Sequence, residues 1–152
     1  MLPDELDLLL VEDNPHEAEL LLRPLGGLAE PARIGIARDG EEALDYLLGR
    51  GLYRHRLGGP LPQLVLLELK LPRLDGVEVL RTLRASPRTS TVPVVVLTSS
   101  AEPREVMQCY QAGANSCVRK PVEFREFTET VGALGRYWLR LNRAAPGGVS
   151  VG

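Results

Sequence analysis

The chain has few cysteines and few aromatic residues, and its charges nearly cancel. Only two of its 152 residues are cysteine, too few for a disulfide framework or a four-ligand zinc site. The formal net charge is −2, so the chain lacks the basic character expected of a dedicated nucleic-acid binder. No apolar run approaches the roughly 20 residues that a membrane-spanning helix needs. We therefore expect neither a nucleic-acid partner nor a membrane partner.

The composition that is present is that of an ordinary globular domain. Hydrophobic residues make up 44% of the chain and charged residues 25%, which is typical of a folded protein rather than a disordered one. The length suits one domain with a sizeable core, and we expect that domain to span residues 1–141. Residues 142–152 are rich in glycine and alanine and predict a flexible tail. Residues 1–5 are acidic and do not resemble a signal peptide, which favours a cytoplasmic location.

Strand-like and helix-like segments alternate five times along the chain. Short apolar runs predict strands at 6–11, 32–37, 64–67, 92–97 and 115–119. A helical pattern follows each run, and the last one repeats apolar residues from Phe124 to Leu141. Between the second and third units, Gly49–Gln63 has four glycines, two prolines and no periodicity, which predicts a long loop. The alternation predicts an α/β fold, a doubly wound (βα)5 domain with helices on both faces of a five-stranded parallel sheet.

Charged and hydroxyl residues stand at the predicted carboxyl ends of four strands. They are Glu12 and Asp13, Glu68, Thr98, and Lys120. In open parallel sheets this edge forms the functional crevice. Carboxylates gathered there favour a hard cation such as Mg²⁺, and a hydroxyl with an ammonium favours an anionic group such as phosphoryl. For Asp13 taken alone, a helix-capping role is an equally good interpretation.

Four motifs cover most of the chain and point to one family. They are LLLVEDNP at 8–15, LVLLELKLPRLDG at 64–76, VPVVVLTSS at 92–100 and AGANSCVRKP at 112–121. With these motifs the chain resembles the receiver domain of two-component response regulators, and most of all the stand-alone receivers paired with bacterial phytochromes. The resemblance implies a flavodoxin-like strand order of 2-1-3-4-5.

The resemblance also implies roles for the residues of the crevice. Glu12 and Asp13 would hold Mg²⁺ as a cofactor, together with the backbone carbonyl of Lys70. Thr98 would contact and report a phosphoryl group, and Lys120 would pair with it. The expected partner is a sensor histidine kinase, with a bacterial phytochrome as the candidate. We further expect a homodimer through the fourth helix, the last strand and the last helix, and no enzymatic activity of the chain's own.

Position 68 departs from the pattern of that family, which places its phosphoacceptor aspartate there. Glu68 carries one more methylene, which displaces its carboxylate by about 1.5 Å, and a misplacement of about 1 Å costs on the order of a hundredfold in rate. The longer side chain would reach Lys120 directly or approach the metal as a further ligand, which would weaken or alter Mg²⁺ binding. We therefore favour a receiver that is not phosphorylated, acting as a phosphomimetic or as a docking module. The alternatives are phosphorylation at Glu68 and an engineered replacement of aspartate.

A second departure lies at Cys117, where receivers usually place the aromatic residue of the switch. Cysteine cannot fill that pocket, so Cys117 is better interpreted as a small buried residue of the last strand. A reducing cytosol disfavours a disulfide between Cys117 and Cys109.

A different class, a flavodoxin-like carrier, shares this topology. Such a carrier cradles a phosphate at the turn after the first strand, using small and hydroxyl residues. Here that turn is Glu12–Pro15, whose acidic residues would repel a phosphate, so the carrier remains the remote alternative.

Overall fold

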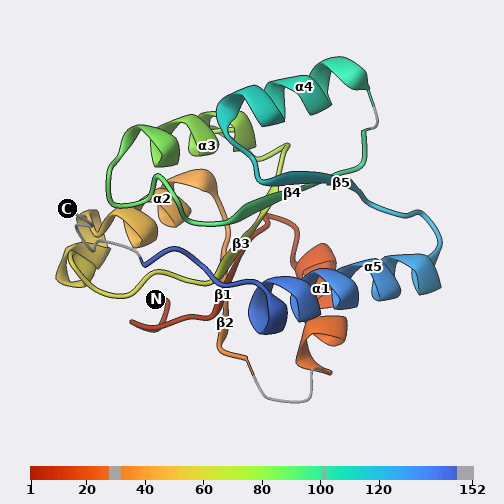
Figure 1. Cartoon of the computed structure of the whole chain (residues 1–152), viewed down its shortest axis with the longest axis horizontal. Helices are drawn as coiled ribbons and strands as arrows, with labels where there is room; N and C mark the ends of the chain where they lie inside the picture. Colours follow the sequence, from red (N-terminus) through yellow and green to blue (C-terminus); the bar gives the residue numbers. More distant parts are fainter. Residues whose placement is uncertain (28–31, 101, 147–152) are drawn as a thin grey trace.

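The computed structural model describes residues 1–27, 32–100 and 102–146, which form a five-stranded sheet between two layers of helices (Figure 1). The strands are β1 (Leu8–Val11), β2 (Ile34–Ala37), β3 (Leu64–Glu68), β4 (Val94–Thr98) and β5 (Ser116–Arg119). Every neighbouring pair is parallel, and the order is β2-β1-β3-β4-β5. The predicted doubly wound (βα)5 fold and its strand order are confirmed.

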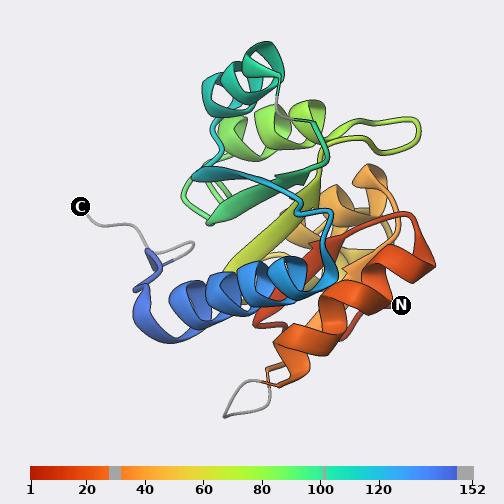
Figure 2. The same ribbon diagram turned by 90° about the vertical axis from the view of Figure 1, so that its right-hand side faces the viewer.

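Five helices cover the sheet, with three on one face and two on the other. They are α1 (Pro15–Gly26), α2 (Gly40–Leu48), α3 (Gly76–Ala85), α4 (Pro103–Ala112) and α5 (Phe124–Arg136). Helices α2, α3 and α4 pack in sequence over one face, whereas α1 and α5 lie side by side on the other (Figures 1 and 2). Short polar side chains begin α1, α2 and α3, as when Asn14 accepts from the backbone amides of α1 and Asp75 from that of Glu78.

The core consists of two apolar layers, one on each face of the sheet. Successive side chains of a strand point to opposite faces, so Leu9 and Val65 pack under α2 and α3 while Leu8 and Leu66 pack against α1 and α5. Because both faces are covered, β1 is apolar along its whole length, and β3 and β4 are apolar up to their last residue. Only their ends are free to carry polar groups, and this places the charged residues at the edge of the sheet.

The prediction of a long loop at Gly49–Gln63 is wrong in part, because Gly51–Arg56 forms a 3₁₀ helix, η1. In a 3₁₀ helix residues three apart share a face, and Tyr53 and Arg56 are both buried on the inner face of η1. The Tyr53 hydroxyl donates to Glu42 Oε2 over 2.9 Å and accepts from the backbone N–H of Leu2 over 2.9 Å. Tertiary contacts therefore order a segment that has no helical pattern of its own.

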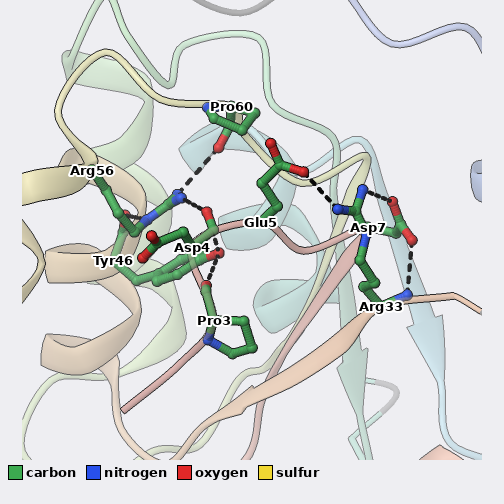
Figure 3. Close-up of polar contacts among 8 residues, drawn as sticks. All are labelled: Pro3, Asp4, Glu5, Asp7, Arg33, Tyr46, Arg56 and Pro60. Atoms are coloured by element: carbon green, nitrogen blue, oxygen red, sulfur yellow. Dashed lines mark hydrogen bonds and ion pairs between the residues drawn. The ribbon is translucent and has the colours of Figure 1, made fainter.

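Arg56 fastens η1 to the N-terminal segment and to α2. Its guanidinium donates to three backbone carbonyls, those of Tyr46, Asp4 and Pro60, and its Cζ lies 3.6 Å from the centroid of the Tyr46 ring. We call Arg56 and its contacts with Asp4, Tyr46 and Pro60 the Arg56 anchor (Figure 3). The side chain is only 2% exposed, and burial lowers the pKa of Arg56 against the opposing effects of Tyr46 and Asp4.

The final helix does not keep one apolar face from Phe124 to Leu141. After α5 the chain continues in a π-helical turn, η2 (Tyr137–Leu141), in which the N–H of Asn142 donates to the carbonyl of Tyr137 over 2.7 Å. A π turn adds one residue to the turn and shifts the phase of the side chains. After this shift Leu139 is buried, while Leu141 is 72% exposed. At the other end of the helix, Phe124 is the first residue of α5 and is 59% exposed.

η2 ends at Leu141, and the single domain expected over residues 1–141 stays a prediction. Residues 142–146 have neither helix nor strand, and the rest of the expected flexible tail, 147–152, lies outside the described residues. Among the helices of the described part of the chain, none is long and apolar enough to cross a membrane.

Candidate functional site

The carboxyl ends of the strands bring the predicted site residues to one edge of the sheet. Glu12 follows β1, Glu68 ends β3, Thr98 ends β4 and Lys120 follows β5. Because these four strands are adjacent in the sheet, their ends form a continuous row. Glu17, in the first turn of α1, reaches the same edge and lies close to Lys120. We call the group of Glu12, Glu17, Glu68 and Lys120 the acidic crevice.

Lys120 is the cation of the acidic crevice. Its Nζ donates to Glu68 Oε2, and the two side chains are only 11% and 13% exposed. Nζ also lies 3.5 Å from Glu17 Oε2. Burial acts to lower the pKa of Lys120, but the hydrogen bond to Glu68 and the charges of Glu68, Glu12 and Glu17 outweigh burial and raise it. Lys120 is therefore firmly protonated and bridges two carboxylates.

Glu12 is the group that the acidic crevice leaves unsatisfied. The residue is 4% exposed, and its Oε2 has no hydrogen-bond partner among the residues that the structure describes. Burial raises the pKa of Glu12 to about 7, against the opposing charge of Lys120 and with a further increase from the Glu68, Asp13 and Glu17 carboxylates. A buried oxygen of this kind is an acceptor without a donor, which suits a cation.

Hydrogen bonds of Thr98 link the ends of β4 and β5 next to the acidic crevice. The residue is buried at 3% exposure. Its Oγ1 accepts from the N–H of Ser100 over 3.1 Å, and its carbonyl accepts from the N–H of Lys120 over 2.7 Å. The backbone position of Lys120 is thus coupled directly to the strand that carries Thr98.

The other predicted metal ligands, Asp13 and Lys70, are exposed residues. The Asp13 charge acts on Glu12, and the backbone N–H of Lys70 donates to Glu68 Oε1 over 3.4 Å. Within residues 1–27, 32–100 and 102–146, no three or more His, Cys, Asp or Glu side chains are grouped so that they could hold a metal. Glu68 is engaged by Lys120 and by the Lys70 amide. The donors at this edge are nevertheless all oxygen atoms, and the unpartnered Glu12 Oε2 fits a hard cation such as Mg²⁺.

Cys117 lies in β5, half-buried, with its N–H donating to the hydroxyl of Tyr110 over 3.2 Å. The sequence did not single out Tyr110, which is on α4, nor Glu17. The signal for Glu17 was its place in the first turn of the helix after β1, next to the carboxylates. Tyr110 gave no signal, because its position near β5 depends on the packing of α4.

Comparison with known families matches residues 8–132 to the response regulator receiver domain. This chain belongs to the response regulator receiver family. The assignment favours the receiver over the flavodoxin-like carrier on the same topology.

Three similar proteins belong to signalling systems of different organisms. The probable methanogenesis regulatory protein FilR2 of Methanothrix harundinacea is 42% identical over 142 residues, 93% of this chain and 88% of the relative. Response regulator Rcp1 of a Synechocystis strain is 33% identical over 87% of this chain and 88% of its own length, and the Mn²⁺-bound form of Rcp1 aligns with a TM-score of 0.83 at 30% identity, over 93% of this chain and 99% of that one. The phosphorylated cyanobacterial phytochrome response regulator RcpA aligns with a TM-score of 0.84 at 30% identity, over 92% and 98% of the two chains.

Proposed function

We propose that this receiver works in two-component signalling without being phosphorylated, with Glu68 standing in for a phosphorylated residue. The supporting observation is the buried hydrogen-bonded ion pair between Glu68 Oε2 and Lys120 Nζ. An acyl-phosphate forms when a free carboxylate oxygen attacks phosphorus in line. Here the Lys120 ammonium, which would pair with a phosphoryl group, is already paired with Glu68 Oε2, and Oε1 accepts from the Lys70 amide.

Glu68 mimics a phosphorylated residue only in part, because its carboxylate has less negative charge and fewer oxygens than a phosphoryl group. A carboxylate carries one negative charge and two oxygens, whereas a phosphoryl group carries roughly −1.5 to −2 and three acceptor oxygens. Glu68 therefore holds Lys120 as a phosphoryl group would, and it leaves Thr98 without an anionic partner. The receiver would be biased toward an active-like conformation, and its output would be contact with another protein rather than catalysis.

The same proposal includes a divalent cation at the acidic crevice. Glu12, Asp13 and the backbone carbonyl of Lys70 are the groups that would hold Mg²⁺, and the Glu68–Lys120 pair would weaken its binding. The cation would supply neutralisation of the carboxylate charges. The unpartnered Glu12 Oε2 supports this assignment, and the Mn²⁺-bound structure of Rcp1 supports it from a relative.

The proposed partner is a sensor histidine kinase. The likeness to RcpA, a phytochrome response regulator by description, supports a phytochrome-type kinase, whereas the likeness to FilR2 supports a wider range of signals. We also propose a homodimer through α4, β5 and α5, where Met107 and Tyr110 of α4 are exposed apolar side chains. Light scattering that shows a monomer at high micromolar concentration would exclude the homodimer.

The proposal is tested by intact mass after incubation with a small-molecule phosphodonor and Mg²⁺. A phosphoryl group adds about 80 Da. We expect no gain for the parent chain and a gain for the Glu68→Asp variant, whose shorter carboxylate withdraws from Lys120. Glu68→Gln is the matched control, because it keeps the length of the side chain and removes the nucleophile.

Two outcomes contradict the proposal. A gain of that mass by the parent chain, mapped to Glu68, would make it a working phosphoacceptor. No gain by either the parent or the Glu68→Asp variant would show that the crevice is inactive for reasons other than Glu68, and that Glu68 does not stand in for a phosphoryl group.

A further inference from the structure

Among the five strands that the structure describes, β2 gives no side chain to the acidic crevice. The turn that follows β2, residues 38–39, leads into α2 at Gly40 and contacts the connection between β3 and α3 instead. We call this connection, residues 69–75, the β3–α3 loop. It carries Lys70, whose backbone carbonyl is a proposed cation ligand and whose N–H donates to Glu68 Oε1 over 3.4 Å. Contacts that fix this loop therefore fix one side of the site.

The first contact is an ion pair between the β3–α3 loop and the start of α2. Arg73 Nη2 lies 3.1 Å from Asp39 Oδ2, while Asp39 Oδ1 accepts from the backbone N–H of Glu42 over 2.8 Å. One carboxylate thus caps α2 and binds the loop. Arg73 has a φ of 64° and is the one non-glycine residue with a positive φ in the described part of the chain. Because a side chain disfavours this conformation, the ion pair helps to hold the loop in it.

The second contact is a close approach of two backbones at Gly40. The residue is buried, and a Cβ on it would lie 2.8 Å from the carbonyl oxygen of Leu74 and 2.8 Å from Cγ2 of Val79. The Leu74 oxygen belongs to the backbone of the β3–α3 loop, so it cannot rotate aside as the end of a side chain can. Gly40 does not have a positive φ. Its small size is therefore needed for space, to let the loop lie against α2.

The β3–α3 loop is also closed on itself, so a shift at one point moves the rest. The N–H of Gly76 donates to the carbonyl of Leu69 over 2.8 Å, and a Cβ on Gly76 would lie 2.7 Å from the carbonyl oxygen of Glu68. The N–H of Leu74 donates to the carbonyl of Pro72 over 2.7 Å. The loop is therefore a compact unit that lies between the end of β3 and the start of α2.

We propose that Asp39 and Gly40 are positioning residues of the site. Through Arg73 and Leu74 they set the position of the β3–α3 loop, and with it the carbonyl and the N–H of Lys70. The inference rests on the proposed function, because the cation that the Lys70 carbonyl would hold is itself a proposal. It gives the turn after β2 a part in the site although no atom of that turn would contact the cation.

The main test uses Gly40→Ala in the full-length chain, which adds one methyl group against the Leu74 carbonyl and changes no ligand. Calorimetric titration with MgCl₂ at pH 8 measures the affinity, and we expect binding about tenfold weaker than in the parent chain, as for other residues that support metal ligands. In metal-free buffer, hydrogen exchange of the Gly76 N–H should be faster than in the parent chain. Glu41→Ala is the matched control, because Glu41 is the next residue of α2 and is exposed, and its affinity should stay within about twofold.

A double-mutant cycle tests the ion pair separately. Asp39→Asn keeps an oxygen that can cap α2 and removes the charge that binds Arg73, so we expect Mg²⁺ binding to weaken about threefold, as for a weak ion pair. Arg73→Gly adopts a positive φ without cost, so its loop no longer needs the ion pair. In the Arg73→Gly background Asp39→Asn should therefore have no effect. A long-range effect of charge on the cation would persist in that background.

Two results overturn the proposal. One is Mg²⁺ affinity in Gly40→Ala within twofold of the parent chain, and the other is an equal effect of Asp39→Asn with and without Arg73. The cycle decides where Gly40→Ala fails to fold. No binding of Mg²⁺ by the parent chain would contradict the cation site of the proposed function. The positioning of the loop is then decided by hydrogen exchange alone, and an unchanged Gly76 N–H in Gly40→Ala overturns it.

Discussion

Two buried cations lie at opposite ends of the sheet, and they are satisfied in different ways. At the carboxyl ends of the strands, Lys120 contacts the carboxylates of Glu68 and Glu17. At the amino ends, Arg56 contacts three backbone carbonyls and the ring of Tyr46. The carbonyls are neutral acceptors and leave the positive charge of Arg56 in place, whereas the carboxylates around Lys120 outnumber it and leave an excess of negative charge.

The difference separates a group that stabilises the fold from a group that prepares a site. The acceptors of the Arg56 anchor belong to three separate parts of the chain, so the anchor holds them together without requiring a ligand. In the acidic crevice the excess charge falls on Glu12, whose Oε2 has no partner among the described residues. An uncompensated buried carboxylate reduces stability until a proton or a cation arrives. The following changes test this contrast, beginning with the largest expected effect.

Removing Arg56 should produce the largest loss of stability. Arg56→Met keeps much of the packing volume and removes the donor to one buried and two partly buried backbone carbonyls, which costs about 4 kcal/mol of unfolding free energy. Urea unfolding measures the loss. Arg54→Met is the matched control, because Arg54 lies in the same 3₁₀ helix and is exposed, and we expect a change within about 0.5 kcal/mol. Equal effects of the two variants would mean that Arg56 is no anchor.

Removing the charge of Glu12 should increase the unfolding free energy, in contrast to the loss expected for Arg56→Met. The pKa of Glu12 is raised in the folded state to about 7, so the native protein binds more protons than the unfolded chain at intermediate pH. Stability conferred by the neutral form is therefore present at low pH and is lost as the pH rises toward 7. In metal-free buffer at pH 8, Glu12→Gln should be more stable than the parent by about 3 kcal/mol.

At pH 4 the Glu12→Gln variant and the parent should have nearly the same stability. Glu19→Gln serves as the control, since Glu19 is an exposed carboxylate on α1, and it should change little at either pH. A stabilisation of Glu12→Gln that is independent of pH would contradict the assigned cause.

Mg²⁺ should also compensate the buried charge of Glu12 and stabilise the folded protein, by a smaller amount. A cation that binds only the folded state stabilises it by about 1.4 kcal/mol at tenfold excess over its dissociation constant. We expect a Mg²⁺ titration at pH 8 to raise the thermal midpoint of the parent chain and to leave Glu12→Gln unchanged. An equal increase for both proteins would place the cation elsewhere.

The smallest effect is expected at an exposed pair near the Arg56 anchor. Arg33 binds Glu5 and Asp7 (Figure 3), and although burial acts to raise the pKa of Asp7, the hydrogen bonds and charge of Arg33 lower it. This stability is present above the ordinary pKa of Asp7 and is lost as the pH falls below it. Asp7→Asn should cost about 0.5 kcal/mol at pH 7. The cost should shrink at high salt, and a cost that salt does not change would point to packing instead.

The sheet and the crevice could be predicted because their signals are local. Apolar runs that end in Glu12, Glu68 and Thr98 specify where each strand stops, and parallel topology brings such ends together. The buried role of Arg56 could not be predicted, because arginine is rarely buried and its acceptors are backbone carbonyls that no sequence pattern reveals. The π turn at Tyr137–Leu141 also depends on packing against the sheet, and it displaced the expected inward position of Leu141.

The hydrogen bond between Tyr110 and Cys117 has a consequence for association with other chains. β5 is an edge strand, and an edge strand with free N–H groups is a template for strand addition and aggregation. The Tyr110 hydroxyl occupies the N–H of Cys117 at the middle of this four-residue strand. One side chain of α4 therefore interrupts the donor row, and an approaching extended segment cannot pair along the length of β5 without first displacing a tyrosine.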